Sequence, residues 1–279
     1  MSIQEVLQWM LKLAVIGLLL IGLLVVDIYF EVNYPKVNRV TVNSEKIPPG
    51  AKINILQISD FHNWQPNDHH QNLLREIRQL NPDLIVITGD FIDRKTDNLN
   101  NVYSLVEELV QINPYTFFVC GNHEWANKNK KSFLSGLSNR GVRVINNEHA
   151  VWFNNQLTIN ICGVDDPSKG RADLDKAING INTELFTLLL AHAPAIIEKE
   201  AITRADLVLC GHTHGGQIRL PFVGAIIAPG QGLFPTYDKG IYNIDRNTTL
   251  YIDSGLGTGV LPIRFLNRSQ ISFITVTGK

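Results

Sequence analysis

Apolar and polar positions along the first half of the chain predict strands and helices in alternation. Three short apolar runs, at 53–58, 84–87 and 116–120, have the length and composition of buried strands. Apolar residues at helical spacing fill the intervals, and Pro82 lies just beyond the first helix. These are Leu73, Leu74, Ile77 and Leu80, then Val102, Leu105, Val106, Leu109 and Val110. The alternation is typical of an α/β protein with a largely parallel sheet covered by helices.

The second half changes to shorter segments separated by turn residues. Its predicted strands lie at 142–145, 150–153, 157–162, 186–190 and 207–210. Short helices are expected at 174–178 and 195–201. From Gly215 onward the pattern indicates strands and turns without clear helices.

The N-terminus has a different pattern from the rest. An uninterrupted apolar run from 13 to 26, extended by its flanks to 6–30, is long enough to cross a bilayer. Trp9 and Tyr29 fall where aromatic side chains meet the membrane interface. We predict a transmembrane anchor at 1–30, a proline-containing stem at 31–50 and a catalytic domain at 51–279.

A cleaved signal peptide is the alternative for this segment, because a short positive region precedes the apolar run. Residues 27–34 contain no cleavage site of the small-residue kind, which favours an uncleaved anchor. Lys12 precedes the span, whereas Asp27 and Glu31 follow it. This asymmetry favours a cell-membrane protein with its N-terminus inside and its catalytic domain extracytoplasmic.

Composition narrows the protein class. Of 279 residues, 44% are hydrophobic and 18% are charged, which fits a globular protein with a sizeable core. The net charge is −1 without a basic cluster, so we expect no nucleic-acid binding. Cys120, Cys162 and Cys210 each end an apolar run just before a glycine, which favours small buried side chains over disulfides or redox groups.

The five strong apolar runs all end on residues that bind divalent metals. These residues are Asp60, His62, Asp90, Asn122, His192, His212 and His214. Taken singly, each has a structural explanation, such as a helix cap, a turn or a core histidine. Ligands gather at the carboxyl ends of parallel strands, so we expect all seven to converge. Their mixed nitrogen and oxygen donors suit Mn²⁺, Fe²⁺/³⁺, Zn²⁺ or Co²⁺ better than calcium.

The order of these motifs resembles the calcineurin-like metallophosphoesterase family over roughly residues 51–277. The motifs are Asp60-Phe61-His62, Gly89-Asp90, Gly121-Asn122-His123-Glu124, His192 and Gly211-His212-Thr213-His214. The GHTHGGQ form is similar to the small bacterial, membrane-associated branch related to YkuE and YaeI. The chain departs from that branch at Ser269-Gln270, where a Pro-Glu pair is expected.

The resemblance implies a four-layer α/β/β/α sandwich that holds two divalent metal ions. The first ion would take Asp60, His62, Asp90 and His214. The second would take Asp90, Asn122, His192 and His212, so that Asp90 bridges the two. Ions about 3.5–4 Å apart can clamp a phosphate and lower the pKa of a bridging water, whose hydroxide is the nucleophile.

His123 is the implied catalytic residue that binds no metal; in the family, the matching histidine protonates the leaving group or stabilises the transition state. Asp93 is a candidate to orient His123, although a helix N-cap explains it equally well. Arg94 and Arg264 could contact phosphate, but we expect both to be solvated surface side chains. We expect Glu124 to support the metal ligands without binding a metal itself, and Gln217 to line the site.

The resulting prediction is a membrane-anchored, dinuclear-metal phosphoester hydrolase. A narrower alternative is a pyrophosphatase that acts on a lipid-linked nucleotide sugar, such as UDP-2,3-diacylglucosamine. A catalytically silent metal-binding scaffold is the alternative from another class. The partners expected are a phosphoester substrate and the membrane, and substrate choice is assigned to the loops 63–70, 165–171 and 220–238.

Overall fold

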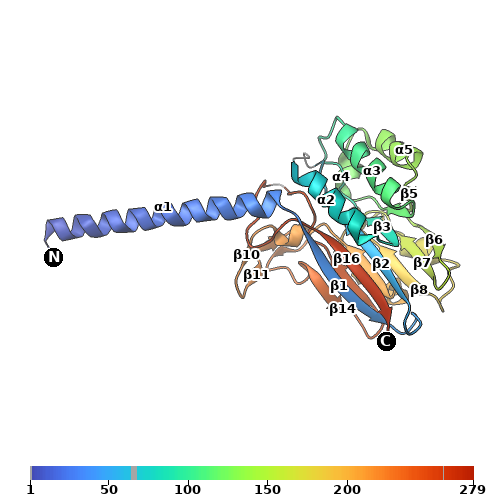
Figure 1. Cartoon of the computed structure of the whole chain (residues 1–279). Coiled ribbons are helices and arrows are strands. Elements are labelled where there is room, and N and C mark those ends of the chain that lie inside the picture. Colours follow the sequence, from blue (N-terminus) through green and yellow to red (C-terminus); the bar gives the residue numbers. More distant parts are fainter. Residues whose placement is uncertain (1, 64–67, 260) are drawn as a thin grey trace.

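The computed structural model describes residues 2–63, 68–259 and 261–279. A long helix, α1 (Ile3–Asn33), projects away from a domain built on two six-stranded sheets (Figure 1). Residues 64–67 of the predicted substrate loop 63–70 lie outside the described residues.

The first sheet has the strand order β1-β16-β2-β3-β4-β5. In that order its strands are Lys36–Ser44, Gln270–Gly278, Lys52–Ile58, Leu84–Ile87, Thr116–Phe118 and Arg143–Val144. Strands β2 to β5 are parallel, whereas β16 runs antiparallel to β2 and parallel to β1. All four residues of β3 are buried, as a strand covered on both faces requires.

The second sheet has the order β14-β15-β9-β8-β7-β6. In that order its strands are Gly240–Asn243, Thr249–Ile252, Leu207–Cys210, Phe186–Leu190, Thr158–Gly163 and Glu148–Phe153. The four middle strands are parallel, and an antiparallel strand closes each edge. Both sheets therefore present several parallel carboxyl ends to one rim of the domain.

Helices cover the outer face of each sheet and complete the predicted four layers. Over the first sheet lie α2 (Asp68–Leu80), α3 (Asn100–Ile112), α4 (Asn122–Ala126) and α5 (Lys130–Asn139). Over the second sheet lie α6 (Leu174–Ile178) and two 3₁₀ helices, η2 (Pro194–Glu198) and η3 (Glu200–Arg204). A third apolar core fills the space between the sheets, where side chains such as Ile55 and Leu188 are fully buried. The α/β/β/α prediction is confirmed.

Short elements complete the rim. The 3₁₀ helices η1 (Pro167–Lys169) and η4 (His214–Gly216) follow β7 and β9. Two small hairpins, β10 (Arg219–Leu220) with β11 (Gly224–Ala225) and β12 (Ile227–Ala228) with β13 (Gly232–Leu233), come directly after η4.

The structure corrects three local expectations. The predicted stem at 31–50 contains β1, because Val40 and Val42 point inward at the two-residue spacing of a strand. The helix expected at 195–201 is instead the pair of 3₁₀ helices η2 and η3. Helices α4 and α5 were not anticipated. The three cysteines are free and buried, as expected.

Helix α1 has no buried residue, and its length and apolar composition are sufficient to cross a membrane. Its C-terminal end is nevertheless bonded to the domain. The backbone N–H of Ser269 donates to the Glu31 carbonyl at 2.8 Å, and that of Asn267 donates to the Glu31 carboxylate at 2.7 Å. The helix is therefore held at one end by the polypeptide that enters β16.

Candidate active site

The predicted ligands converge on the rim where β2, β3, β4, β8 and β9 end. Three groups of side chains have ligand atoms mutually within 4.8 Å. The first contains Asp60, His62 and His214, and the second contains Asp90, His192 and His212. The third joins Asp93 and His123 to His62. The six predicted ligands in the first two groups come from four separate loops, as the common direction of the strands requires.

In the first group the donor atoms face one another across short gaps. Nε2 of His62 lies 3.2 Å from Nε2 of His214. The Asp60 Oδ1 is 3.5 Å from the same nitrogen of His214 and 3.9 Å from that of His62. Asp60 is fixed in this position, because its carboxylate also accepts a hydrogen bond from the Ser59 hydroxyl at 2.6 Å.

The second group is oriented from behind. The Nδ1 of His192 lies 2.8 Å from the Thr88 carbonyl, which selects the tautomer whose Nδ1–H donates to that oxygen. Its Nε2 therefore points into the site, 3.0 Å from Nδ1 of His212 and 3.1 Å from Oδ2 of Asp90. Burial lowers the pKa of His192, but Asp90 and Asp60 outweigh burial and raise it to about 10. The two carboxylates therefore favour a positive charge at this position.

Asp90 lies between the two groups. Its Oδ2 is 3.1 Å from the His192 Nε2 in one group and 3.9 Å from the His62 Nε2 in the other. Its Oδ1 accepts a 2.8 Å hydrogen bond from the backbone N–H of His123. The carboxylate is therefore placed to contact cations in both positions.

Five of the seven predicted ligands have positive φ, a region that residues other than glycine rarely adopt. They are Asp60 at 51°, His62 at 49°, Asp90 at 51°, His212 at 71° and His214 at 50°. Such strain persists only where the surroundings enforce it, and it concentrates at functional sites. Here it turns the side chains inward at the strand ends.

The motif glycines are required by close approach. A Cβ on Gly121 would lie 2.3 Å from the Asp90 carboxylate. A Cβ on Gly211 would lie 1.8 Å from the Ser59 hydroxyl and 2.4 Å from the Asp60 carboxylate. Any side chain at either position would displace a ligand.

One buried polar atom tests whether the site suits metal ions. The Oδ1 of Asn122 has no hydrogen-bond partner. An unpaired buried polar atom is costly, so its retention calls for an explanation. The Asn122 oxygen is a metal-ligand atom of the predicted set, and a neutral imidazole and a carboxamide oxygen suit a borderline divalent cation. The side chains present therefore fit a pair of such ions.

His123 pairs with Asp93 beside these groups. The Nδ1 of His123 lies 2.6 Å from the Asp93 Oδ1, and its Nε2 lies 4.0 Å from the Asp90 Oδ2. Burial raises the pKa of Asp93, but the Arg94 amide and His123 outweigh burial and lower it. The carboxylate is therefore ionised at neutral pH and accepts the hydrogen bond. No helix begins at Asp93 in the described structure, so the N-cap explanation does not apply.

Glu124 ties the second and third motifs together. Its buried carboxylate accepts hydrogen bonds from the backbone N–H groups of Gly121 (2.8 Å), Asp90 (2.9 Å), Phe91 (2.7 Å) and Ile92 (3.1 Å). It thus lies behind the ligands, where the sequence placed it. The loops of Asp90 and Asn122 are fixed relative to each other through this one side chain.

Comparison with known proteins agrees with this geometry. The family model described as calcineurin-like phosphoesterase matches residues 53–216, from β2 through the last motif. The chain belongs to this family. An uncharacterized metallophosphoesterase of Aquifex aeolicus is 35% identical over 261 residues, covering 90% of this chain and 95% of that protein.

Two further relatives extend the match. The uncharacterized metallophosphoesterase YkuE of Bacillus subtilis is 32% identical, covering 89% of this chain and 87% of the relative. A Danio rerio transmembrane protein with a metallophosphoesterase domain is also 32% identical, covering 87% of this chain and 57% of the relative. The predicted family and its bacterial branch are therefore confirmed, and the chain is a metallophosphoesterase with candidate metal sites of His and Asp.

A cavity of about 330 Å³ opens over the metallophosphoesterase site. Arg94 and Lys169 line it with positive charge, and Gln217 lies along its wall, as expected. Lys169 belongs to the predicted substrate loop 165–171, and Pro229 and Gly230 belong to the predicted substrate loop 220–238. None of the three residues was singled out from the sequence. Pro229 and Gly230 carry no chemical signal there, and they line the site because the hairpins fold back over it.

The expectation for Arg264 is wrong. Its side chain is fully buried and donates to the backbone carbonyls of Ser254 (2.6 Å), Gly255 (3.0 Å), Gly257 (2.6 Å) and Asn267 (3.2 Å). A guanidinium can satisfy several carbonyls at once because its five N–H groups point in fixed directions. Arg264 therefore organises a loop beside the site and does not contact solvent or phosphate.

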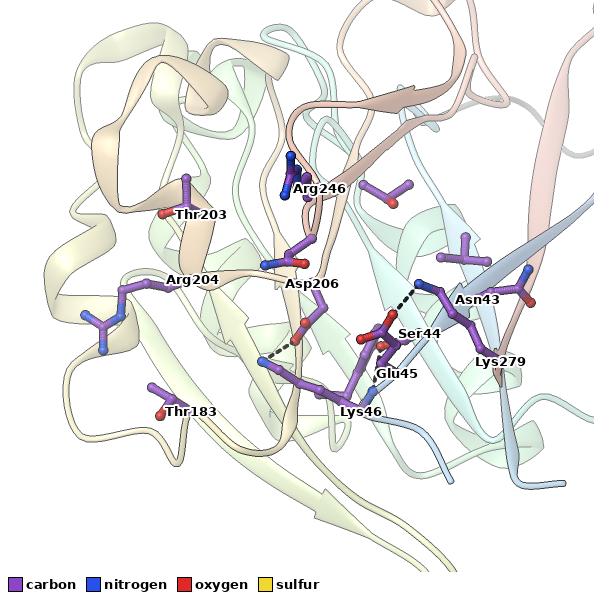
Figure 2. A pocket seen from close by; sticks show the side chains of 14 residues that line it. Asn43, Ser44, Glu45, Lys46, Thr183, Thr203, Arg204, Asp206, Arg246 and Lys279 are labelled. Carbon is purple, nitrogen blue, oxygen red and sulfur yellow. Dashed lines mark hydrogen bonds and ion pairs between the residues drawn. The ribbon is translucent and has the colours of Figure 1, made fainter. Parts of the chain in front are cut away.

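A larger cavity of about 450 Å³ lies elsewhere in the domain (Figure 2). It is lined by the end of β1 and by the residues that precede β8 and β9. Each of its two acids is paired with a lysine: Lys46 lies 3.0 Å from Asp206, and Lys279 lies 2.7 Å from Glu45. Arg204 and Arg246 also line it. Among the described residues, the groups with metal-ligand geometry all lie at the other cavity.

Proposed function

We propose that this metallophosphoesterase is a membrane-anchored phosphoester hydrolase that uses two divalent metal ions. The observation that carries the proposal is the placement of Asp90 within 4 Å of imidazole nitrogens from both ligand groups. A carboxylate shared in this way is what a paired metal site needs. Two bound ions would polarise the phosphoryl oxygens and acidify a water molecule.

The ligands divide between the two positions as the motifs suggest. Asp60, His62 and His214 would hold the first ion together with Asp90. Asn122, His192 and His212 would hold the second, also with Asp90. Mn²⁺, Fe²⁺/³⁺, Zn²⁺ and Co²⁺ all suit these donors.

His123 would supply the proton that the leaving group needs. Asp93 accepts from its Nδ1, which leaves Nε2 facing the ligands and the cavity. A histidine held this way can carry a proton at Nε2 and donate it to the departing oxygen. Arg94 and Lys169, at the cavity wall, would attract the anionic substrate.

Helix α1 supports the anchor, and relatives named as transmembrane proteins agree with it. Lys12 before the apolar run and Asp27 after it favour a domain outside the cytoplasm. Protease added to intact cells should therefore digest the domain. Full protection of the domain would contradict this orientation.

The activity test uses the full chain in detergent, because β1 and the end of α1 belong to the folded domain. After loading with Mn²⁺, we expect hydrolysis of bis-p-nitrophenyl phosphate, p-nitrophenyl phosphate or both, and no turnover by Asp90→Asn. Turnover confined to a UDP-linked lipid would favour the narrower pyrophosphatase. No metal-dependent turnover of any of the three substrates would favour the silent scaffold.

A further inference from the structure

A long segment next to the active site is exposed, apolar and uncharged. Between Arg219 and Asp238 the sequence contains no Asp, Glu, Lys or Arg. Residues 219–234 form the two small hairpins, and we call their uncharged part, residues 220–234, the apolar lip. Its exposed large side chains are Leu220, Phe222, Val223, Ile227, Leu233 and Phe234.

Exposure on this scale is unusual for a water-facing surface. Phe222 is fully exposed at a turn with φ of 65°, and Phe234 is 67% exposed with φ of 51°. Leu266, on the neighbouring loop, shares a shallow groove with Phe222. A contiguous apolar patch without charges is typical of a surface that meets a membrane or a partner.

The position of α1 favours a membrane over a partner protein as the surface that the lip meets. The loop that receives the helix end at Asn267 and Ser269 continues back to Phe265, whose carbonyl accepts from Arg219 N–H at 3.0 Å. Phe265 N–H donates in turn to the Gln217 carbonyl at 3.0 Å. The hairpin of β10 and β11 is thus joined by hydrogen bonds to the foot of the helix. Figure 1 shows β10 and β11 on the side of the domain from which α1 projects.

The inner side of the lip forms part of the active site. Pro229 and Gly230 line the cavity with His212. Gly216, two residues past His214, packs so closely on Ala225 that an added Cβ would lie 2.2 Å from the Ala225 Cβ. The same segment therefore presents apolar side chains outward and borders the metal-binding loop inward.

We propose that the apolar lip inserts into the interfacial region of the bilayer that holds α1, as a second membrane contact beside the helix. Apolar and aromatic side chains of this kind partition into that region. The cavity mouth would then lie at the lipid surface, where it can accept a phosphoester carried on a lipid. This substrate class rests on the proposed hydrolase function, whereas the membrane contact rests only on the proposed anchor α1.

The contact can be measured without any activity. The full chain is placed in nanodiscs of equal parts phosphatidylethanolamine and phosphatidylglycerol, and Phe222→Cys is labelled with the environment-sensitive dye NBD. The wild-type chain, whose three cysteines are buried, gives the labelling background. Phe153→Cys is the matched control, because Phe153 is 70% exposed on β6, at the edge of the domain away from α1 (Figure 1).

We expect a blue-shifted emission for the label at 222 and quenching by doxyl-labelled lipids, with neither at 153. Equal spectra and equal quenching at the two positions would overturn the proposal. The label at 222 reports membrane insertion even if the protein hydrolyses nothing.

The substrate class needs a second comparison in the same nanodiscs. Phe222→Ser combined with Phe234→Ser is tested beside Phe153→Ser. The substrates are soluble bis-p-nitrophenyl phosphate and a diacylglyceryl p-nitrophenyl phosphate diester in the bilayer. We expect the rate of the lip variant on the lipid diester to fall about tenfold relative to its rate on the soluble one, and the ratio for Phe153→Ser to stay at the wild-type value. An equal loss on both substrates, or no loss on the lipid, would contradict the lipid-borne substrate.

Discussion

At the carboxyl ends of the central strands, carboxylates and imidazoles face one another in a buried cluster, whereas the larger cavity of Figure 2 pairs each acid with a lysine. In the first region the Asn122 Oδ1 has no protein partner. In the second, Asp206 accepts from the Thr187 N–H at 2.7 Å as well as from Lys46.

This difference in hydrogen-bond partners indicates which of the two cavities binds a ligand. Buried polar groups that lack partners cost free energy unless something outside the chain satisfies them. Half-exposed ion pairs satisfy themselves and contribute little. The volume of the cavity in Figure 2 does not identify it as the active site, whereas the facing carboxylates and imidazoles identify the candidate metal site.

The largest effect should come from removing one ligand. We expect elemental analysis of His212→Ala to find one metal ion of two. We also expect its activity to fall by more than roughly 100-fold, which is the cost of losing a residue that only hydrogen-bonds to a metal ligand. His149→Ala, at an exposed histidine on β6, is the control and should change neither. Two ions retained by His212→Ala would contradict the assignment of His212 to the second ion.

His123→Ala should have the next largest effect. We expect kcat for phosphoester hydrolysis to fall by about 10²–10⁴-fold with metal content unchanged, since the role proposed for His123 is to transfer a proton and not to bind an ion. A loss of metal would instead place His123 among the ligands.

Asp93→Asn should cost less, about 10–100-fold in kcat, because the role proposed for Asp93 is to orient His123 without touching the reacting atoms. The control is Asp97→Asn, an exposed aspartate paired with Lys128 nearby. Similar kinetics for the two variants would mean that the 2.6 Å contact between Asp93 and His123 has no catalytic role.

Lys46→Met tests the other side of the comparison. We expect unchanged hydrolysis and a loss of less than about 1 kcal/mol in the free energy of unfolding, measured by urea denaturation. A large loss of activity would show that the cavity of Figure 2 takes part in function.

Much of the fold follows from the sequence because its apolar runs are strong and end on polar motifs. The strands β3, β8 and β9 match their predicted ranges, since each is buried on both faces and bounded by turn residues. β1 was missed because flanking prolines indicated a stem. α5 was missed because its apolar positions are few, and its inward face depends on the neighbouring α3.

In the candidate site, too, some features could be predicted from the sequence and others could not. Its candidate metal ligands could be identified because their chemistry is explicit and their positions at strand ends repeat. The positive φ of Asp90, the burial of Arg264 and the exposure of Phe222 could not, because each depends on which distant segments pack around it.

The most direct test is a titration of Mn²⁺ into metal-free full-length protein, with turnover of bis-p-nitrophenyl phosphate followed at each addition. We predict no turnover without metal and a rise that saturates at two ions per chain. Saturation at one ion, or undiminished turnover in the metal-free protein, would contradict a hydrolase built on a metal pair bridged by Asp90.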